Sequence, residues 1–257
     1  SGVFDPIREH ELVPVFYHFD NHLKIQGKDI IEKIIKSQSK VFLIIHYFGF
    51  PDVKAQEYIE LARDNGLIII EDAAHGMYTD MISNGCGKWG DYTLFSLHKM
   101  LPMEEGGLLR ANEGIILPDS NYMPEISPFN YNFQKISEIR RNNYLILDRF
   151  IRDVPEGVSP LFDLLPDEVV PQTYPIVLPI SNRDKIYEYM NERGWGVVSL
   201  YHTLIKEIAA ETFKEEKKLS QMIMNLPVHQ DVNPKLYVDM VNDLDKAIEI
   251  FKYRYDQ

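Results

Sequence analysis

Cysteine is almost absent from this 257-residue chain. Cys86 is the only one, which excludes an intramolecular disulfide framework and a metal cluster held by several thiolates. His202 and His229 show no cysteine or carboxylate spacing typical of a metal site, so we interpret both as structural or substrate-side residues. We therefore expect no metal.

Long apolar runs and positive charge are also scarce. No run approaches the roughly 20 residues that span a bilayer, and the first residues, Ser-Gly-Val-Phe-Asp-Pro, lack the basic-then-apolar pattern of a signal peptide. The 27 Lys and Arg residues are outnumbered by 39 Asp and Glu residues, which gives a net charge of −12. This balance argues against nucleic acid or an anionic membrane as a general partner. We expect a soluble cytoplasmic protein.

Apolar runs alternate with amphipathic segments, which indicates an α/β fold. The order strand, helix, strand in the first half predicts a parallel unit, and the second half repeats the alternation. Strands are predicted at 12–19, 41–46, 67–70, 92–97, 108–111, 172–180 and 197–201. Helices are predicted at 27–37, 53–64, 131–150, 183–193, 220–224 and 237–253.

Lys99 stands at the end of a stretch rich in aromatic residues. Pro102 stops any continuing ladder, and Gly106-Gly107 marks a turn into the next strand. A lysine just past the carboxyl end of a buried strand stands where open α/β sheets bind ligands, and its amine can form a Schiff base with a carbonyl cofactor. The lysine alone does not distinguish this role from a solvated surface charge, which is what most lysines are.

Asp72 ends the apolar run 67–70, which has no alternation and predicts a strand buried on both faces. An acid in such a place needs a partner. One interpretation is that Asp72 caps the following turn. The other is that Asp72 pairs with the protonated pyridine nitrogen of pyridoxal phosphate, because that ring needs a carboxylate there to act as an electron sink.

Four short motifs in sequence order carry a resemblance to a known family. They are Glu71-Asp72-Ala73-Ala74-His75, Gly87-Lys88-Trp89-Gly90-Asp91, Phe95-Ser96-Leu97-His98-Lys99 and Glu105-Gly106-Gly107. In this order and spacing they resemble the DegT-type family of pyridoxal-phosphate sugar aminotransferases, a branch of fold-type I. The resemblance extends over essentially the whole chain.

One spacing departs from the family pattern. The family separates the serine from the lysine by five positions, whereas Ser96 and Lys99 are three apart. Lys99 nevertheless lies seven residues before Gly106, as the family lysine does. A dehydrase branch of the family has histidine in the lysine position, and His98 is adjacent to that position but not in it.

The resemblance implies roles for particular residues. Lys99 would be the catalytic residue, and Asp72, His75, Ser96 and Lys99 would bind the cofactor, with Ser96 at its phosphate. The segment that begins at His46 lies beside the cofactor in the family, although His46 itself fits equally well as a core histidine at a strand end.

The resemblance also implies a fold and an activity. Residues 1–125 would be part of the large cofactor-binding domain of a fold-type I transferase, and residues 126–257 a smaller C-terminal α/β domain. With pyridoxal 5'-phosphate, the enzyme would transfer an amino group from an amino acid such as glutamate to a keto-sugar, usually nucleotide-linked, in cell-surface polysaccharide or secondary-metabolite biosynthesis. We expect a homodimer with a shared active site, because half of a large domain exposes apolar surface.

A second hypothesis remains open. The family has a further N-terminal stretch with a Ser-Gly-Thr-type turn that cradles the cofactor phosphate, and residues 1–40 show nothing like it. The sequence is therefore either a fragment of an active enzyme or a truncated, non-catalytic or complementing homologue that keeps the fold and the dimer surface.

Overall fold

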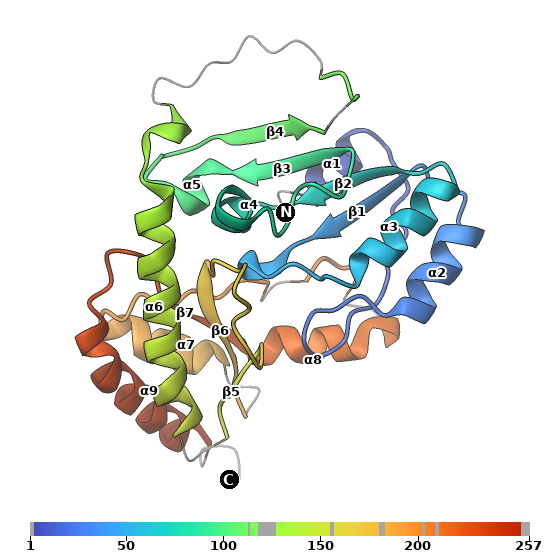
Figure 1. Cartoon of the computed structure of the whole chain (residues 1–257). Coiled ribbons are helices and arrows are strands. Elements are labelled where there is room, and N and C mark those ends of the chain that lie inside the picture. The colour runs from blue at the N-terminus through green and yellow to red at the C-terminus, as the bar shows by residue number, and fades with distance from the viewer. Residues whose placement is uncertain are drawn as a thin grey trace.

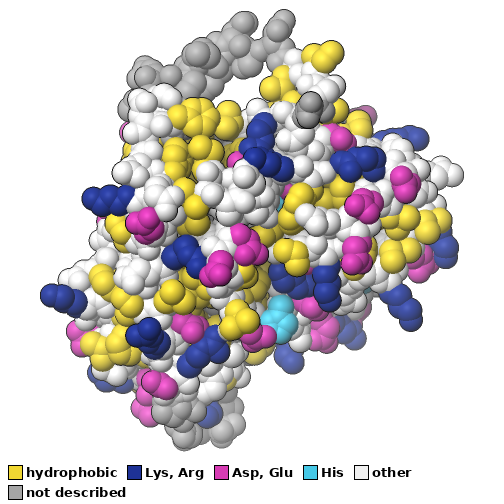
Figure 2. Space-filling model, in the orientation of Figure 1, with side chains coloured by type: hydrophobic (Ala, Val, Ile, Leu, Met, Phe, Trp, Pro, Cys, Tyr) yellow, Lys and Arg dark blue, Asp and Glu magenta, His cyan; other side chains and the backbone are white. Residues whose placement is uncertain are grey.

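In the computed structural model, the described residues form two β-sheets with helices around them (Figure 1). No helix of the described residues is long and apolar enough to cross a membrane. On the face seen in Figure 2, Lys and Arg side chains lie interspersed with Asp and Glu side chains. The structure describes residues 3–112, 114–117, 127–154, 157–179, 183–201, 204–208 and 211–252.

The first sheet has four strands in the order β1-β2-β3-β4 (Figure 1). These are β1 (Val41–Ile45), β2 (Ile68–Asp72), β3 (Tyr92–Ser96) and β4 (Gly107–Ala111). The first three run parallel, and β4 is antiparallel to β3. Because parallel neighbours need a crossover, α3 (Ala55–Asp64) joins β1 to β2, and α4 (Met77–Ser83) follows β2. Gly106, at φ +119°, makes the turn into β4.

One face of this sheet is covered and the other is open. Phe42, Ile44 and Ile69 point to the side where α2 (Gly27–Lys36) and α3 pack. The alternate side chains point the other way and remain exposed: Val41 at 45%, Ile68 at 46%, Leu94 at 41% and Leu109 at 39%. The prediction that β2 is buried on both faces is therefore wrong for the described residues, because nothing among them buries these four side chains.

The second sheet is antiparallel, in the order β5-β6-β7. Its strands are β5 (Ser159–Pro160), β6 (Thr173–Val177) and β7 (Ile223–Pro227), and the helices of this half are α6 (Phe133–Arg152), α7 (Arg183–Glu192), α8 (Lys214–Met222) and α9 (Tyr237–Lys252). Apolar side chains from α6, α9 and the sheet form one core. Phe48 and Phe50, from the loop after β1, belong to this same core. The loop after β1 therefore connects the first sheet to the second half of the chain.

Predicted strands were wrong where pairing depends on distant residues. Segment 12–19 forms no strand beyond an isolated bridge from Phe19 to Ile25. Segment 197–201 likewise contributes only a bridge from Val198 to Asn225. Residues 223–224, predicted as helix, begin β7 instead, because their buried side chains pair with β6. The predicted boundary between 125 and 126 lies outside the described residues.

Predicted helices were mostly correct, since their periodicity is local. Those at 27–37, 53–64, 131–150, 183–193 and 237–253 are confirmed to within two residues at each described end. Only part of the apolar surface of these helices is buried: Ile30, Ile34 and Leu147 are buried, whereas Ile31, Ile35 and Leu145 are exposed. The N-cap of α3 is Lys54, which makes no side-chain cap hydrogen bond.

Candidate active site

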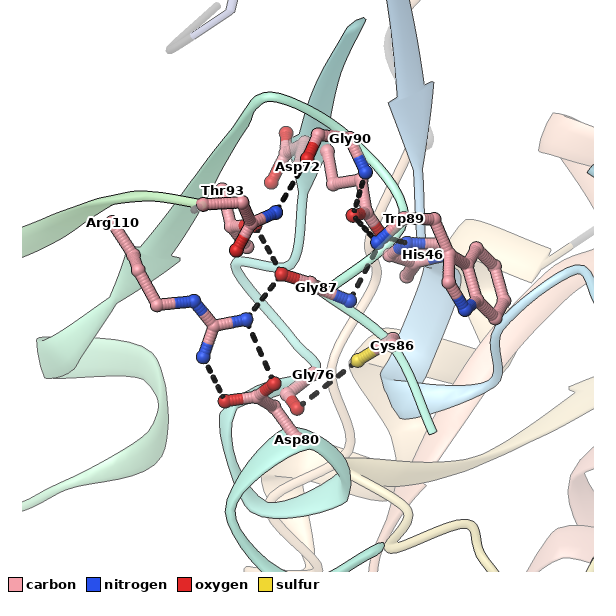
Figure 3. Close-up of polar contacts among 12 residues, drawn as sticks. His46, Asp72, Gly76, Asp80, Cys86, Gly87, Trp89, Gly90, Thr93 and Arg110 are labelled. Atoms are coloured by element: carbon pink, nitrogen blue, oxygen red, sulfur yellow. Dashed lines mark hydrogen bonds and ion pairs between the residues drawn. The ribbon is translucent and has the colours of Figure 1, made fainter. Parts of the chain in front are cut away.

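Glu71 and Asp72, the two acids that end β2, point to opposite faces of the sheet and have different roles. Glu71 lies on the covered face and is fully buried. Its carboxylate accepts hydrogen bonds from the backbone N–H groups of Gly87 at 2.8 Å, Trp89 at 2.7 Å and Gly90 at 2.6 Å, and it lies 2.8 Å from His46 Nε2. These four partners are labelled in Figure 3. Glu71 therefore holds the Gly-x-x-Gly loop in place.

Burial disfavours the charged form of the Glu71 carboxyl, but the hydrogen bonds to that carboxyl favour the charged form more strongly. Although desolvation raises the pKa of the Glu71 carboxyl, the bonds with His46 and the amides of Gly90 and Gly87 hold that pKa below its ordinary value. His46 is itself buried, with its ring edge-on to Trp89. Of the two interpretations of His46, the structure confirms the core histidine.

The Gly-x-x-Gly loop is fixed from a second side by Arg110 (Figure 3). Its guanidinium donates to Asp80 at 2.7 and 2.9 Å and to the Gly87 carbonyl, which also accepts from Thr93 Oγ1. A Cβ at Gly87, which has φ +78°, would stand 2.9 Å from Arg110 Nη2. The glycine motif is thus explained by packing within the chain.

Asp72 lies on the open face, in register between Ile45 of β1 and Leu94 of β3. Its Oδ1 accepts a hydrogen bond from the Ala74 backbone N–H at 2.9 Å, so the turn-capping interpretation is confirmed. No donor among the described residues contacts Oδ2. Asp72 can therefore cap the turn with one oxygen and bind a ligand with the other.

His75 and Lys99 meet beyond the ends of β2 and β3. Lys99 is exposed on the short helix α5 (Leu97–Met100), and its Nζ lies 3.5 Å from His75 Nε2. His75 is only 3% exposed, and the Phe48 ring stacks on it at a centroid distance of 5.9 Å and an angle of 16°. Burial first, and the Lys99 charge second, lower the pKa of His75 to about 3. His75 is therefore neutral at physiological pH.

Ser96 and His98 lie together at the end of β3. Ser96 Oγ is 3.3 Å from His98 Nδ1, while Leu97 between them is buried. Because the strand ends at Ser96 and α5 begins at Leu97, the turn into the helix, and not strand alternation, brings the two side chains together. Both side chains are at least partly exposed at the start of α5, the helix that carries Lys99.

Two tyrosines at this site were missed as functional candidates. Tyr47 follows β1, Tyr201 comes from the second half of the chain, and their rings meet edge-on at 5.0 Å. Tyr201 also contacts Phe48 at 5.7 Å and His75 at 6.1 Å between ring centroids. Burial, the nearby Tyr47 hydroxyl and the Asp72 charge together raise the pKa of Tyr201. The nearest sequence signal was Leu200-Tyr201-His202, of which His202 lies outside the described residues.

Other residues considered from sequence lie away from this cluster. His229 is half exposed beside Asp231. Trp195 packs against the core formed by α6, α9 and the second sheet, and its Nε1–H donates to Asp243 at 2.9 Å.

Residues 2–121, which contain all of these motifs, match the model of the DegT/DnrJ/EryC1/StrS aminotransferase family. The match covers 120 of the 257 residues, just under half of the chain. The matched part includes β1 to β4 and the residues Asp72, His75, Ser96 and Lys99.

Sequence relatives of this chain align over part of their own length. An uncharacterized protein of Methanocaldococcus jannaschii is 34% identical over 101 residues, which are 38% of this chain and 26% of that protein. A GDP-perosamine synthase of Escherichia coli O157:H7 is 28% identical over 102 residues, which are 39% of this chain and 28% of the synthase. The alignments thus span about a quarter of the length of these two relatives.

A solved structure extends the likeness to the rest of the chain. Helicobacter pylori PseC, an aminotransferase involved in the biosynthesis of pseudoaminic acid, matches with a TM-score of 0.74 at 19% identity, over 96% of this chain and 76% of that chain. At this identity the likeness shows the fold. The chain therefore has the fold-type I architecture that its sequence predicted.

Proposed function

We propose that this protein is a pyridoxal-phosphate-dependent aminotransferase that transfers an amino group from an amino acid such as glutamate to a nucleotide-linked keto-sugar. The observation that carries the proposal is the convergence of Asp72, His75 and Lys99 at the carboxyl ends of β2 and β3. Ligands bind at this edge in open α/β sheets.

The residues present fit the cofactor. Pyridoxal phosphate supplies an aldehyde that reacts with an amine and a ring that withdraws electrons. Lys99 would hold it through its exposed amine and then move a proton as general acid and base. Asp72 Oδ2 would hold a proton on the pyridine nitrogen. Ser96 and His98 would donate to the phosphate, and Tyr47 and Tyr201 would form the wall beside Asp72.

Substitution of Asp72 by asparagine separates binding from proton movement. Asp72→Asn keeps an oxygen for the Ala74 N–H but loses the charge, so we expect cofactor affinity to change by less than about tenfold while transamination slows by about 10²- to 10⁴-fold. Absorbance titration measures the first, and amino transfer from glutamate measures the second. Asp64→Asn, at an exposed position on α3, is the control. Unchanged turnover in Asp72→Asn would remove that residue from the mechanism.

The proposal of a sugar substrate is based on the names of relatives. Two relatives are named for nucleotide-linked sugars: a GDP-perosamine synthase, and a dTDP-4-dehydro-2,3,6-trideoxy-D-glucose 4-aminotransferase that is 29% identical over 100 residues. The proposal is tested by incubating the chain with pyridoxal phosphate, glutamate and a panel of GDP-, UDP- and dTDP-linked keto-sugars, with mass spectrometry of the products. Failure of the chain to bind cofactor would instead support the non-catalytic or complementing homologue.

We further propose that the protein is a homodimer with a shared site. The open face of the first sheet exposes Leu94 in register with Asp72, Leu109 next to Leu94, and the paired Val41 and Ile68 at the opposite end of their strands. Exposed apolar side chains on one sheet face favour association. Light scattering at micromolar concentration is expected to give twice the mass of one chain. A clean monomer would contradict this expectation.

A further inference from the structure

A pocket of about 370 Å³ is lined by residues from both halves of the chain. Its lining comes from three segments: the turn 20–24, the loop 50–53 after β1, and the loop 162–169 before β6. Asp72, His75 and Lys99 do not line it. Pockets of roughly 300 Å³ and more hold small organic molecules, so this one is large enough for a ligand of its own.

Hydrogen bonds already join the three segments. The His22 ring donates from Nδ1–H to the Leu161 carbonyl at 2.7 Å, and Lys24 Nζ donates to the Pro51 carbonyl at 3.1 Å. The walls of the pocket are therefore in place before a ligand binds, which lowers the free-energy cost of binding.

Lys24 presents a positive charge to the pocket. An ammonium has three N–H donors, and the Pro51 carbonyl accepts from one of them. Among the described residues, Lys24 Nζ has no other hydrogen-bond acceptor and no ion-pair partner. Burial lowers the pKa of Lys24, and the charges of Asp52 and Asp20 oppose this shift. An anionic ligand group at Nζ would form charge-assisted hydrogen bonds with the two remaining donors.

Negative charge lies around the same pocket. Asp20, Asp163 and Glu168 are exposed residues of the lining, and we call them the rim carboxylates. They repel a ligand that carries only negative charge, and Lys24 repels a ligand that carries only positive charge. The pocket therefore favours a small ligand that carries one group of each sign.

The rest of the lining is mostly apolar. The Phe50 and Phe162 rings stack at a centroid distance of 4.1 Å, and Val53, Leu164 and Val169 also line the pocket. Leu164 is 79% exposed and Val53 is 59% exposed. An apolar group of a ligand that covered these side chains would remove apolar surface from water, which stabilises the complex.

We propose that this pocket binds a free α-amino acid with an apolar side chain. The ligand carboxylate accepts from Lys24 Nζ, the ligand ammonium lies among the rim carboxylates, and the ligand side chain packs against Phe50 and Phe162. The pocket is thus an amino-acid site separate from Lys99, and the inference does not rest on the proposed function.

L-Leucine is the first probe of this site, titrated into the chain without cofactor and followed by saturation-transfer NMR. We expect saturable binding at millimolar concentration. Three analogues should each bind at least about 10-fold more weakly: 4-methylpentanoate lacks the ammonium, 3-methylbutylamine lacks the carboxylate, and glycine lacks the side chain. Absence of saturable leucine binding, or equal affinity for leucine and any of the three analogues, would overturn the inference.

Replacing Lys24 by methionine removes the ammonium and keeps an apolar stem. In Lys24→Met we expect leucine to bind about 10-fold more weakly, whereas 3-methylbutylamine should bind no more weakly than to wild type, because it has no carboxylate. Lys28→Met, at an exposed position on α2 outside the pocket, is the matched control and should bind leucine as wild type does. Wild-type affinity for leucine in Lys24→Met would contradict the inference.

A second variant tests the other end of the ligand and leaves Lys24 in place. The double variant Asp163→Asn, Glu168→Gln removes two rim carboxylates at exposed positions, so it should fold as wild type does. Leucine should bind more weakly to it and 4-methylpentanoate more tightly, because the repulsion of a lone carboxylate is reduced. Unchanged affinity for both ligands would overturn the inference.

Lys99→Ala separates this pocket from the candidate active site. Leucine affinity should be the same in Lys99→Ala as in wild type, because Lys99 does not line the pocket. Loss of leucine binding in Lys99→Ala would assign the bound leucine to the candidate active site and overturn the inference. A chain that passes these tests and fails to transaminate would contradict the proposed function alone.

Discussion

Replacing Lys99 by alanine is expected to abolish amino transfer, with a loss on the order of 10⁴-fold or more, because one amine both holds the cofactor and moves the proton. Lys99→Arg should fail equally, since a guanidinium stays protonated and cannot take either role. Lys99 is exposed on α5, so neither change should lower thermal stability measurably. Steady-state transamination and thermal unfolding measure the two effects.

Another exposed lysine supplies the control for this experiment. Lys36 is 71% exposed and pairs with Glu32 at 2.9 Å on the surface of α2. Lys36→Ala should leave turnover unchanged. Amino transfer by Lys99→Ala at a rate near wild type would eliminate Lys99 as the catalytic amine and leave the sequence motif without a chemical role.

Replacing Glu71 by glutamine is expected to cost about 3–5 kcal/mol of unfolding free energy, as breaking a buried, hydrogen-bonded ionic group generally does. The glutamine has one acceptor oxygen for the three loop amides, and its NH₂ faces donors. Urea denaturation measures the loss. Glu32→Gln, which removes an exposed charge on α2, should change the unfolding free energy by less than about 0.5 kcal/mol.

The Glu71 effect should also depend on pH in one direction. The folded-state pKa of Glu71 is lowered, so the unfolded chain binds its proton more readily than the folded chain does. The stability from Glu71 is fully present above the unfolded pKa of about 4.3 and is lost as the pH falls through the lower folded value. The stability difference between wild type and Glu71→Gln should therefore shrink in acid. A difference that stayed constant to pH 3 would mean that the carboxylate charge is not what holds the loop.

The sequence by itself determined the local elements and picked out the candidate site residues. Helix periodicity in 55–64, 133–152 and 237–252 depends on neighbours three and four positions apart, so it could be read from the sequence. The motif order picked out Asp72, His75, Ser96 and Lys99, and the count back from Gly106 kept Lys99 despite the shortened distance from Ser96.

Only the tertiary structure decided which face of the first sheet is covered, and hence what each acid does. Alternation along β2 requires Glu71 and Asp72 to point apart, but it does not say which one meets the loop 87–90 and which meets the open face. The contact of His75 with Lys99 depends on how α5 turns after Ser96, and the approach of Tyr201 depends on packing between residues more than 120 positions apart. Such contacts are set by burial across the whole chain, which no local pattern encodes.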